Sequence, residues 1–201
     1  MANDSKSIKA HKFLLKISKR NKHTKFNNYL SQSNIISIDS RMDKQNDLQF
    51  FIVKTIIGQQ VSVSAARSIW KKVEIYLKEK NSIISTEELA KCGLSKPKAK
   101  YIYGVINNKD LKSVSKKTLQ AMQDNELSEF FLQIKGIGPW TLGIIKMFYL
   151  GNSDTFLNGD LAIKKRALYF FNDSEYMGID YSPYKTYLCL YLWQSLSVKL
   201  D

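Results

Sequence analysis

The apolar residues of this chain recur with helical spacing along nearly its whole length, and this feature restricts the fold more than any other. From about Ser62 to Glu79 the apolar side chains return every three or four residues. The segment 48–57 is apolar almost throughout and too long for an ordinary strand, which favours a buried helix. No pair of segments alternates as half-buried strands do. The sequence therefore predicts an all-α fold of about ten helices.

Serine and proline residues mark several of the predicted helix starts. Ser85 precedes Glu88 in a capping-box pattern, and Ser95 and Ser182 each stand just before a proline-containing helix start. The first predicted helix presents Ile8, His11, Leu15 and Ser18 on one face, with Leu14 and Ile17 beside it, and a polar connection is expected at 39–47. The remaining predicted helices cover 26–30, 48–57, 62–79, 86–91, 96–107, 116–123, 127–134, 139–150, 160–171 and 183–197.

Composition excludes several classes of protein. The chain has 201 residues, of which 44% are hydrophobic and 24% charged, as in globular rather than disordered proteins. Two cysteines, Cys92 and Cys189, cannot form a four-cysteine zinc or iron–sulfur site, and two histidines add no ligand cluster, so no side-chain metal site is expected. No apolar run approaches the roughly 20 residues of a membrane span, and no secretory signal is evident. The expected compartment is the cytosol.

A net charge of +13 indicates an acidic partner. The first thirty residues carry eight lysines and arginines against one aspartate. A basic surface concentrates a polyanion and binds phosphates without sequence preference. Lysine-rich composition also arises from compositional drift, so charge alone leaves nucleic-acid binding open.

The segment 132–141, Leu-Gln-Ile-Lys-Gly-Ile-Gly-Pro-Trp-Thr, lies between two predicted helices. Gly136 and Gly138 permit a hairpin with positive backbone φ, from which backbone N–H groups point outward together. Such a hairpin suits a phosphate, and Lys135 would add a positive charge. An ordinary helix-to-helix turn with a C-cap glycine produces the same pattern, and the pair of glycines alone favours that simpler interpretation.

Asp160 is the candidate acid. An acidic residue at a helix start is usually an N-cap, and taken alone Asp160 fits that role. It stands 22 residues after Gly138, however, a spacing that lets one lobe hold a phosphate while the carboxylate faces a neighbouring sugar.

Four segments together resemble the alkylpurine branch of the helix-hairpin-helix DNA glycosylases, the 3-methyladenine DNA glycosylase II type. They are 56–62 with 65–67, 93–95 with 98–99, the hairpin through Trp140 to Asp160, and 182–185 with 191–193. The joint pattern is specific, whereas no single segment is. The resemblance implies a two-lobed helical glycosylase fold with an active-site cleft between the lobes. The expected lobes are 46–150, ending in the hairpin, and 1–45 plus 151–201, carrying the catalytic aspartate.

The resemblance also implies that the damaged nucleotide is flipped out of the duplex. Gln60 matches the position whose side chain fills the gap, although a capping or core amide has the same sequence signature. Trp140 and Trp193 match pocket aromatics that stack on a cationic base, with core packing as the alternative for each. Gly136, Gly138, Thr141 and Lys135 are expected to contact backbone phosphate, and the hairpin carbonyls can hold a monovalent cation. No other cofactor is required.

Asp160 matches the family's catalytic carboxylate. An alkylated purine is cationic and already a good leaving group, so one carboxylate that stabilises the developing oxocarbenium ion and orients water is sufficient. Bifunctional relatives carry a lysine nucleophile two residues after the second hairpin glycine, where this chain has Trp140, so no lyase chemistry is expected.

The sequence thus predicts a monofunctional DNA glycosylase that removes alkylated purines of the 3-methyladenine type from double-stranded DNA in base excision repair. It is expected to be a monomer and to have no membrane partner. Two alternatives remain: a glycosylase for uracil, hypoxanthine or an oxidised purine, and a non-catalytic helix-hairpin-helix DNA-binding module.

Overall fold

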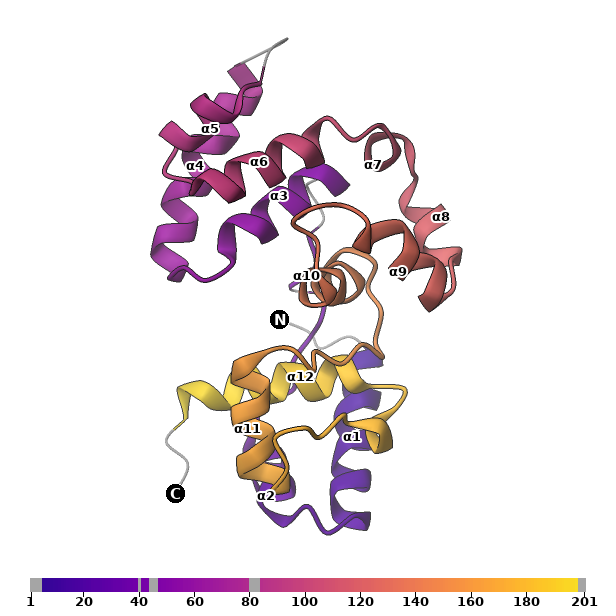
Figure 1. Ribbon diagram of the computed structural model, residues 1–201. Helices are drawn as coiled ribbons and strands as arrows, with labels where there is room; N and C mark the ends of the chain where they lie inside the picture. The colour runs from indigo at the N-terminus through magenta and orange to yellow at the C-terminus, as the bar shows by residue number, and fades with distance from the viewer. Residues whose placement is uncertain (1–4, 40, 44–46, 80–83, 199–201) are drawn as a thin grey trace. The chain divides into compact units, whose positions relative to one another are not determined.

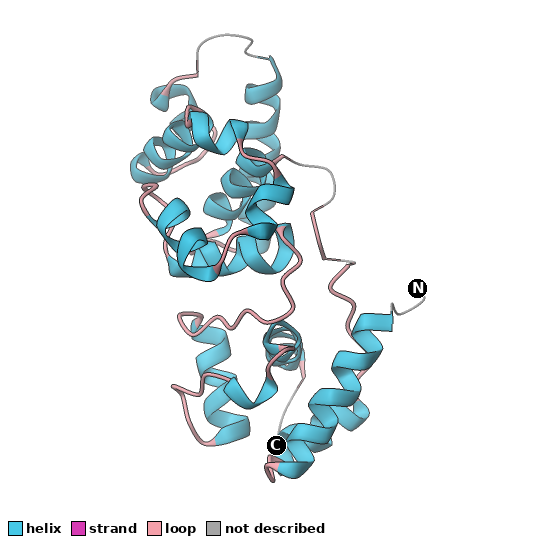
Figure 2. Ribbon diagram, turned by 90° about the vertical axis from the view of Figure 1, so that its right-hand side faces the viewer, coloured by secondary structure: helices cyan, strands magenta, loops and turns pink. Residues whose placement is uncertain are grey.

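The structure is a computed structural model that describes residues 5–39, 41–43, 47–79 and 84–198. All regular elements within these ranges are helices, and the predicted all-α fold is confirmed (Figures 1 and 2). The chain divides into two compact units, one formed by Met1–Met42 with Lys146–Asp201 and the other by Asp43–Ile145. Among the described residues, no helix has both the length and the apolar character that a membrane crossing requires.

The first unit is built around α12, a helix whose buried side chains run continuously from Thr186 to Leu192. A helix that is buried on every side lies at the centre of a core. Tyr187 and Tyr191 of this helix and Tyr181 of the preceding 3-10 turn are completely buried. The helices of this unit are α1 (Ser5–Arg20), α2 (Thr24–Gln32), α11 (Leu161–Phe171) and α12 (Lys185–Gln194), with 3-10 turns at Ile179–Tyr181 and Ser195–Ser197.

The second unit is built around α3, which is predominantly apolar as predicted and buries Phe51, Ile52, Val53, Ile56 and Ile57. Helices α4, α6, α7 and α10 contact it. The helices of this unit are α3 (Leu48–Gly58), α4 (Val63–Glu79), α5 (Thr86–Lys91), α6 (Lys96–Ile106), α7 (Lys109–Ser113), α8 (Lys116–Ala121), α9 (Asp124–Leu132) and α10 (Pro139–Ile144).

Short polar side chains begin many of these helices, because each accepts a hydrogen bond from a backbone N–H that has no partner within the helix. Ser85 and Ser95 cap α5 and α6 as predicted. The predicted cap at Ser182 is wrong. Its hydroxyl donates to Asp154 instead, at 2.7 Å, and α12 begins at Lys185 after the N-cap Tyr184.

Several other boundaries also differ from the prediction. The predicted helix at 127–134 is α9, which starts earlier, at Asp124, because Glu126 accepts a hydrogen bond from the backbone N–H of Gln123. Helix α7 has no counterpart among the predicted helices. The last part of the predicted helix 139–150 is a π-helix, Ile145–Tyr149. Residues 40 and 44–46 of the predicted connection 39–47 lie outside the described residues.

The predicted face of α1 is confirmed at Ser18 but wrong at Ile8, His11 and Leu15, because the buried face lies about one residue earlier. The helix buries Ser7, Ala10, Leu14, Ile17 and Ser18, whereas the predicted Ile8, His11 and Leu15 are only half-buried. The physical reason is that small residues occupy contact positions. Ser7 lies against Tyr187, with 3.4 Å between their hydroxyl oxygens, and Ala10 is fully buried.

Candidate active site

The hairpin between α9 and α10 is closed by backbone hydrogen bonds from Ile134 N–H to the Phe131 carbonyl and from Ile137 N–H to the Ile134 carbonyl. Gly136 has φ +95°, and a Cβ there would lie 2.6 Å from Cβ of Tyr101 on α6. Both the backbone conformation and the close approach of Tyr101 therefore require glycine. The hairpin is thereby fixed on the side of α6.

Gly138 differs from Gly136. It is the N-cap of α10, with φ −102° and ψ −179°, a conformation open to any residue. A Cβ built on Gly138 meets no atom of the protein within 4 Å. Nothing in the fold requires glycine at this position, so the backbone is open to a close approach from outside the protein. That property fits the phosphate contact predicted for Gly138.

The other predicted hairpin residues differ in accessibility. Thr141 is only 1% exposed, and its hydroxyl accepts a hydrogen bond from the Gln59 side-chain amide at 3.0 Å. The side chain of Thr141 is therefore engaged within the protein, and its phosphate contact stays a prediction that falls to its backbone. Trp140 is half-buried, whereas Lys135 is exposed. Whether the hairpin carbonyls hold a monovalent cation stays a prediction.

An open groove of about 780 Å³ adjoins the hairpin within the second unit. Both of its lining lysines, Lys100 and Lys135, are exposed, and one carboxylate, Asp110, also faces it. The lining residues are Lys100, Tyr101, Gly104, Asn108, Asp110, Phe130, Gln133, Ile134, Lys135 and Gly136.

Gln60 lies in the turn between α3 and α4. It is exposed and has φ +54°, a left-handed conformation that is uncommon for a residue with a side chain. Such strained positions concentrate at functional sites. The preceding residue, Gln59, is held through its side chain to Thr141 of α10, so the turn that carries Gln60 lies beside the hairpin helix.

Asp160 is the N-cap of α11. One carboxylate oxygen, Oδ1, accepts hydrogen bonds from the backbone N–H groups of Ala162, at 2.9 Å, and Ile163, at 3.0 Å. These two donors fix the orientation of the carboxylate at the start of the helix. The capping role is thus observed. Asp160 is also half-buried, and a carboxylate held in this way can stabilise a developing cation.

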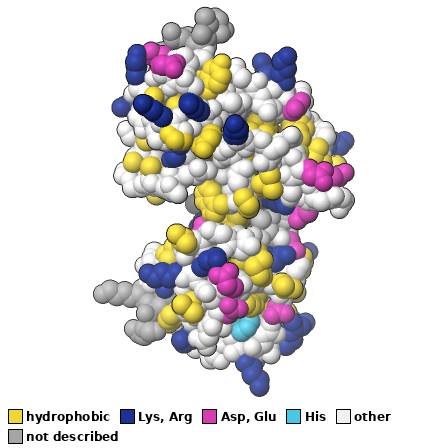
Figure 3. Space-filling view, in the orientation of Figure 1, with side chains coloured by type: hydrophobic (Ala, Val, Ile, Leu, Met, Phe, Trp, Pro, Cys, Tyr) yellow, Lys and Arg dark blue, Asp and Glu magenta, His cyan; other side chains and the backbone are white. Residues whose placement is uncertain are grey.

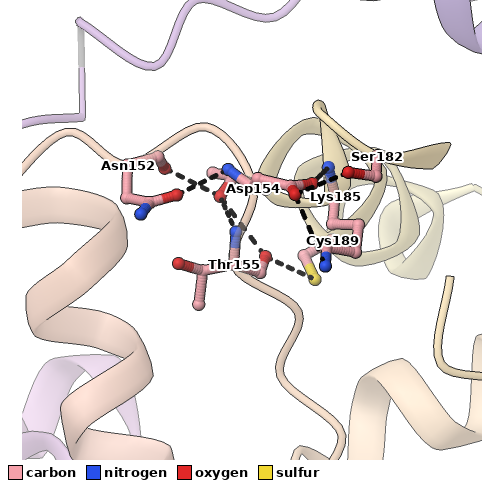
Figure 4. Close-up of polar contacts among 7 residues, drawn as sticks. Asn152, Asp154, Thr155, Ser182, Lys185 and Cys189 are labelled. Atoms are coloured by element: carbon pink, nitrogen blue, oxygen red, sulfur yellow. Dashed lines mark hydrogen bonds and ion pairs between the residues drawn. The ribbon is translucent and has the colours of Figure 1, made fainter. Parts of the chain in front are cut away.

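The loop before Asp160 is fixed to the start of α12 by a cluster of polar contacts (Figure 4). Asp154 accepts hydrogen bonds from the Ser182 hydroxyl and from Lys185 N–H, and its carboxylate also lies 3.5 Å from the Lys185 ammonium. Thr186 donates from its hydroxyl to the Asn152 carbonyl at 2.8 Å and accepts from Thr155 N–H at 3.1 Å.

One face of α12 runs from this cluster to the predicted aromatic residue Trp193. Thr186, Cys189 and Trp193 stand three and then four residues apart, a spacing that places them on the same side of a helix. Cys189 is fully buried below the loop, and burial raises the pKa of its thiol to about 12, so the thiol stays protonated. The half-buried Trp193 stacks on Phe148 of the π-helix, with ring centroids 6.2 Å apart and planes at 21°.

The predicted residues therefore fall into two groups. Asp160 and Trp193 belong to the first unit, where α12 contacts both α11 and the loop before it. Gln60 and the hairpin residues belong to the second unit.

Sequence reasoning missed Asp154, Thr186 and Phe148, for which no motif exists, because their roles depend on contacts between distant segments. Among the described residues, no cluster of three or more His, Cys, Asp or Glu side chains could bind a metal ion.

Comparison with known proteins places this architecture in a single class, the helix-hairpin-helix DNA glycosylases. The chain is 31% identical over 160 residues to an alkylbase DNA glycosidase-like protein of Schizosaccharomyces pombe, covering 71% of this chain and 75% of that protein. It belongs to the alkylbase (3-methyladenine) DNA glycosylase family of that class, which confirms the resemblance inferred from the four sequence segments. No protein-family model matches the chain.

Two solved structures share the fold. A DNA-3-methyladenine glycosidase from Bacillus halodurans superposes with a TM-score of 0.75 and 25% identity, covering 98% of this chain and 92% of that one. A 3-methyladenine DNA glycosylase of Schizosaccharomyces pombe, solved in complex with abasic DNA, superposes with a TM-score of 0.70. It is 21% identical and covers 96% of this chain and 99% of its own.

Proposed function

We propose that this protein is a monofunctional DNA glycosylase that hydrolyses the N-glycosidic bond of alkylated purines in duplex DNA, leaving an abasic site. Family membership supports a glycosylase that acts on alkylated bases. The observation that carries the proposal is the placement of Asp160, whose carboxylate is held by two backbone donors at a helix N-terminus and is borne on a loop anchored to α12.

The proposed reaction needs little beyond this carboxylate. The bond between C1′ and the purine nitrogen breaks with its electron pair moving to the base, which neutralises the positive charge of the alkylated ring. The sugar is left as an oxocarbenium ion, which the negative charge of Asp160 stabilises. Water then adds to C1′ and loses a proton to the carboxylate or to solvent. The products are the free base and an abasic site.

Aromatic side chains supply binding for the cationic base. A positive ring stacks favourably on the electron-rich face of tryptophan. Trp193 is positioned by the same helix that anchors the Asp160 loop, and Phe148 supports its ring from one face. Trp140 remains a predicted pocket residue of the hairpin unit. Its position is the one at which a lysine would give lyase chemistry, so we propose that the enzyme has no lyase activity.

The direct test is release of bases from duplex DNA that carries a single lesion. We expect release of 3-methyladenine and 7-methylguanine, with strand breaks that appear only after alkali treatment. Parallel duplexes with uracil, hypoxanthine or 8-oxoguanine identify a different specificity. Breaks without alkali would contradict the monofunctional assignment, and tight duplex binding with no release of any base would indicate a binding module.

One flipped base requires one site, so we propose an active monomer, which sedimentation analysis tests.

A further inference from the structure

Lys98 of α6 makes a contact that the reaction described above does not use. Its ammonium group donates hydrogen bonds to the carbonyl oxygens of Ile57, at 3.0 Å, and Gln59. Both acceptors stand at the C-terminal end of α3, where backbone carbonyls lack partners inside the helix and the helix dipole is negative. A lysine from another helix thus caps the end of α3.

Lys98 is more buried than the neighbouring lysines of its helix. It is half-buried, whereas Lys96 and Lys100 on the same helix are exposed. Burial lowers the pKa of Lys98, as expected for a cation taken partly out of water. Two of its three N–H donors are used on backbone carbonyls, so its charge is directed into the protein rather than toward a phosphate.

The backbone changes direction immediately after the capped carbonyls. Gln59 is extended, with φ −64° and ψ 129°, and Gln60 enters the left-handed region with φ +54°. Gln59 is held on both sides, since its carbonyl accepts from Lys98 and its side-chain amide donates to Thr141. Gln60 is exposed, and the residues after it include Val61, 38% exposed, and Val63, 78% exposed.

The local conformation of the turn, with a left-handed glutamine followed by exposed valines, is energetically unfavourable by itself. The left-handed conformation is unfavourable for a residue with a Cβ, and exposed valines gain nothing from water. Their arrangement must therefore be maintained by neighbouring contacts, and the two hydrogen bonds from Lys98 are contacts of this kind at the point where the chain turns. Exposed apolar side chains such as Val61 are suited to wedging between stacked bases, and the adjoining amide of Gln60 can hydrogen-bond to the bases that remain.

We propose that Lys98 is a positioning residue that holds the turn 58–62 so that Gln60 and Val61 insert into the duplex where the damaged nucleotide leaves the stack. This inference rests on the proposed glycosylase function. Lys98 acts through the backbone of the turn and touches neither the base nor the reacting sugar. It is needed when a stacked duplex has to be opened and is dispensable when the target base is already unstacked.

The test compares release of 7-methylguanine from duplex and from single-stranded DNA. The variant Lys98→Met keeps the side-chain length and removes the charge and donors, Lys96→Met is the matched control on the same helix, and Gln60→Ala is the comparator. We expect Lys98→Met and Gln60→Ala to lower release from duplex about tenfold or more. Release from single strands should change by less than about twofold, as should both rates for Lys96→Met.

Binding to an abasic-analogue duplex with 2-aminopurine opposite the gap gives a second measurement that needs no catalysis. Insertion of the turn should change the fluorescence with wild type and Lys96→Met but much less with Lys98→Met. Thermal unfolding verifies that each variant is folded, and Lys98→Gln replaces Lys98→Met should the latter fail to fold.

Equal loss of release from duplex and single strands, or wild-type rates and fluorescence for Lys98→Met, would overturn the inference. A wild-type protein that releases no base from either form would instead refute the proposed function. The role of Lys98 would then be decided by the fluorescence change alone.

Discussion

Gly136 and Gly138 stand two residues apart in one hairpin, yet glycine serves a different purpose at each. We expect Gly136→Ala to destabilise the protein by roughly 1–3 kcal/mol, because it places a Cβ at positive φ and against Tyr101. Gly138→Ala should change the free energy of unfolding by less than about 0.5 kcal/mol, because no atom lies near its Cβ. Denaturant unfolding measures both effects.

DNA binding should be weakened by Gly138→Ala although this variant hardly changes the stability of the fold. Folded Gly138→Ala protein should bind duplex about tenfold more weakly, the equivalent of one charge-assisted hydrogen bond, because a methyl group obstructs the approach of the phosphate. A Gly138→Ala protein with wild-type affinity would show that the phosphate is bound elsewhere.

A pH dependence arises from two histidines in the aromatic core of the first unit. The rings of His11 and His23 contact the hydroxyls of Tyr191 and Tyr181. Burial lowers both pKa values below about 6.5, and Asp180 partly opposes the shift for His23. The folded state thus prefers neutral histidine. The protein is therefore more stable above pH 6.5, where both histidines are neutral in the folded and unfolded states, and its free energy of unfolding decreases as the pH falls below that value.

We therefore expect the melting temperature to fall between pH 7.5 and 5.5, and His23→Gln to reduce that fall. An unchanged dependence in His23→Gln would mean that other groups cause the acid sensitivity.

At the scale of single residues, the sequence predicted the hairpin and the position of Asp160 but could not distinguish roles that depend on neighbours. A glycine pair does not reveal which member has positive φ. Only the fold shows that the Thr141 hydroxyl is buried and accepts a hydrogen bond from the Gln59 side chain. Lys98 belongs to one of the segments that carry the family resemblance, but its acceptors lie about forty residues earlier in the chain.

Among the elements, α12 organises the first unit, and Thr186 is its main connection to the loop before Asp160. Thr186→Val removes the donor to Asn152 and the acceptor for Thr155 N–H, leaving two backbone groups unpaired. We expect a loss of stability of about 1–3 kcal/mol and a lower single-turnover rate at saturating DNA. Thr186→Ser keeps the hydroxyl and is the control. A destabilised Thr186→Val protein with an unchanged rate would show that this link does not position Asp160.

Helix identity is easier to predict than helix boundaries. The apolar stretches of α3 and α12 can only be buried, and apolar content is visible in sequence. The buried face of α1 differs from the prediction because Ser7 and Ala10 pack by being small rather than apolar. The start of α12 differs because Ser182 bonds to a residue 28 positions earlier.

For the whole molecule, the net charge of +13 is distributed over both units (Figure 3). Helix α1 carries exposed lysines three or four residues apart, which corresponds to about 4.5–6 Å along the helix. This spacing suits a line of phosphates. The lysines are Lys6, Lys9, Lys12, Lys16 and Lys19.

We expect affinity for duplex DNA to fall steeply with salt. Replacing Lys9, Lys12 and Lys16 by glutamine should reduce the slope of log affinity against log salt by up to about one unit for each phosphate that is no longer neutralised. The same change at Lys71, Lys72 and Lys78 of α4 removes an equal charge. A difference in salt slope between the two triple variants therefore shows that the location of the lysines matters and not only their total charge. Equal slopes for the two would contradict a specific role for α1.

The most direct test of the proposed mechanism is the single-turnover release of 7-methylguanine from a duplex by wild type and Asp160→Asn, with binding to an abasic-analogue duplex measured alongside. Asparagine retains a capping oxygen, so the fold and the binding should persist while the negative charge is removed. We predict that the rate falls by about 100-fold or more with little change in affinity. Release by Asp160→Asn at a rate near that of wild type would contradict the single-carboxylate mechanism.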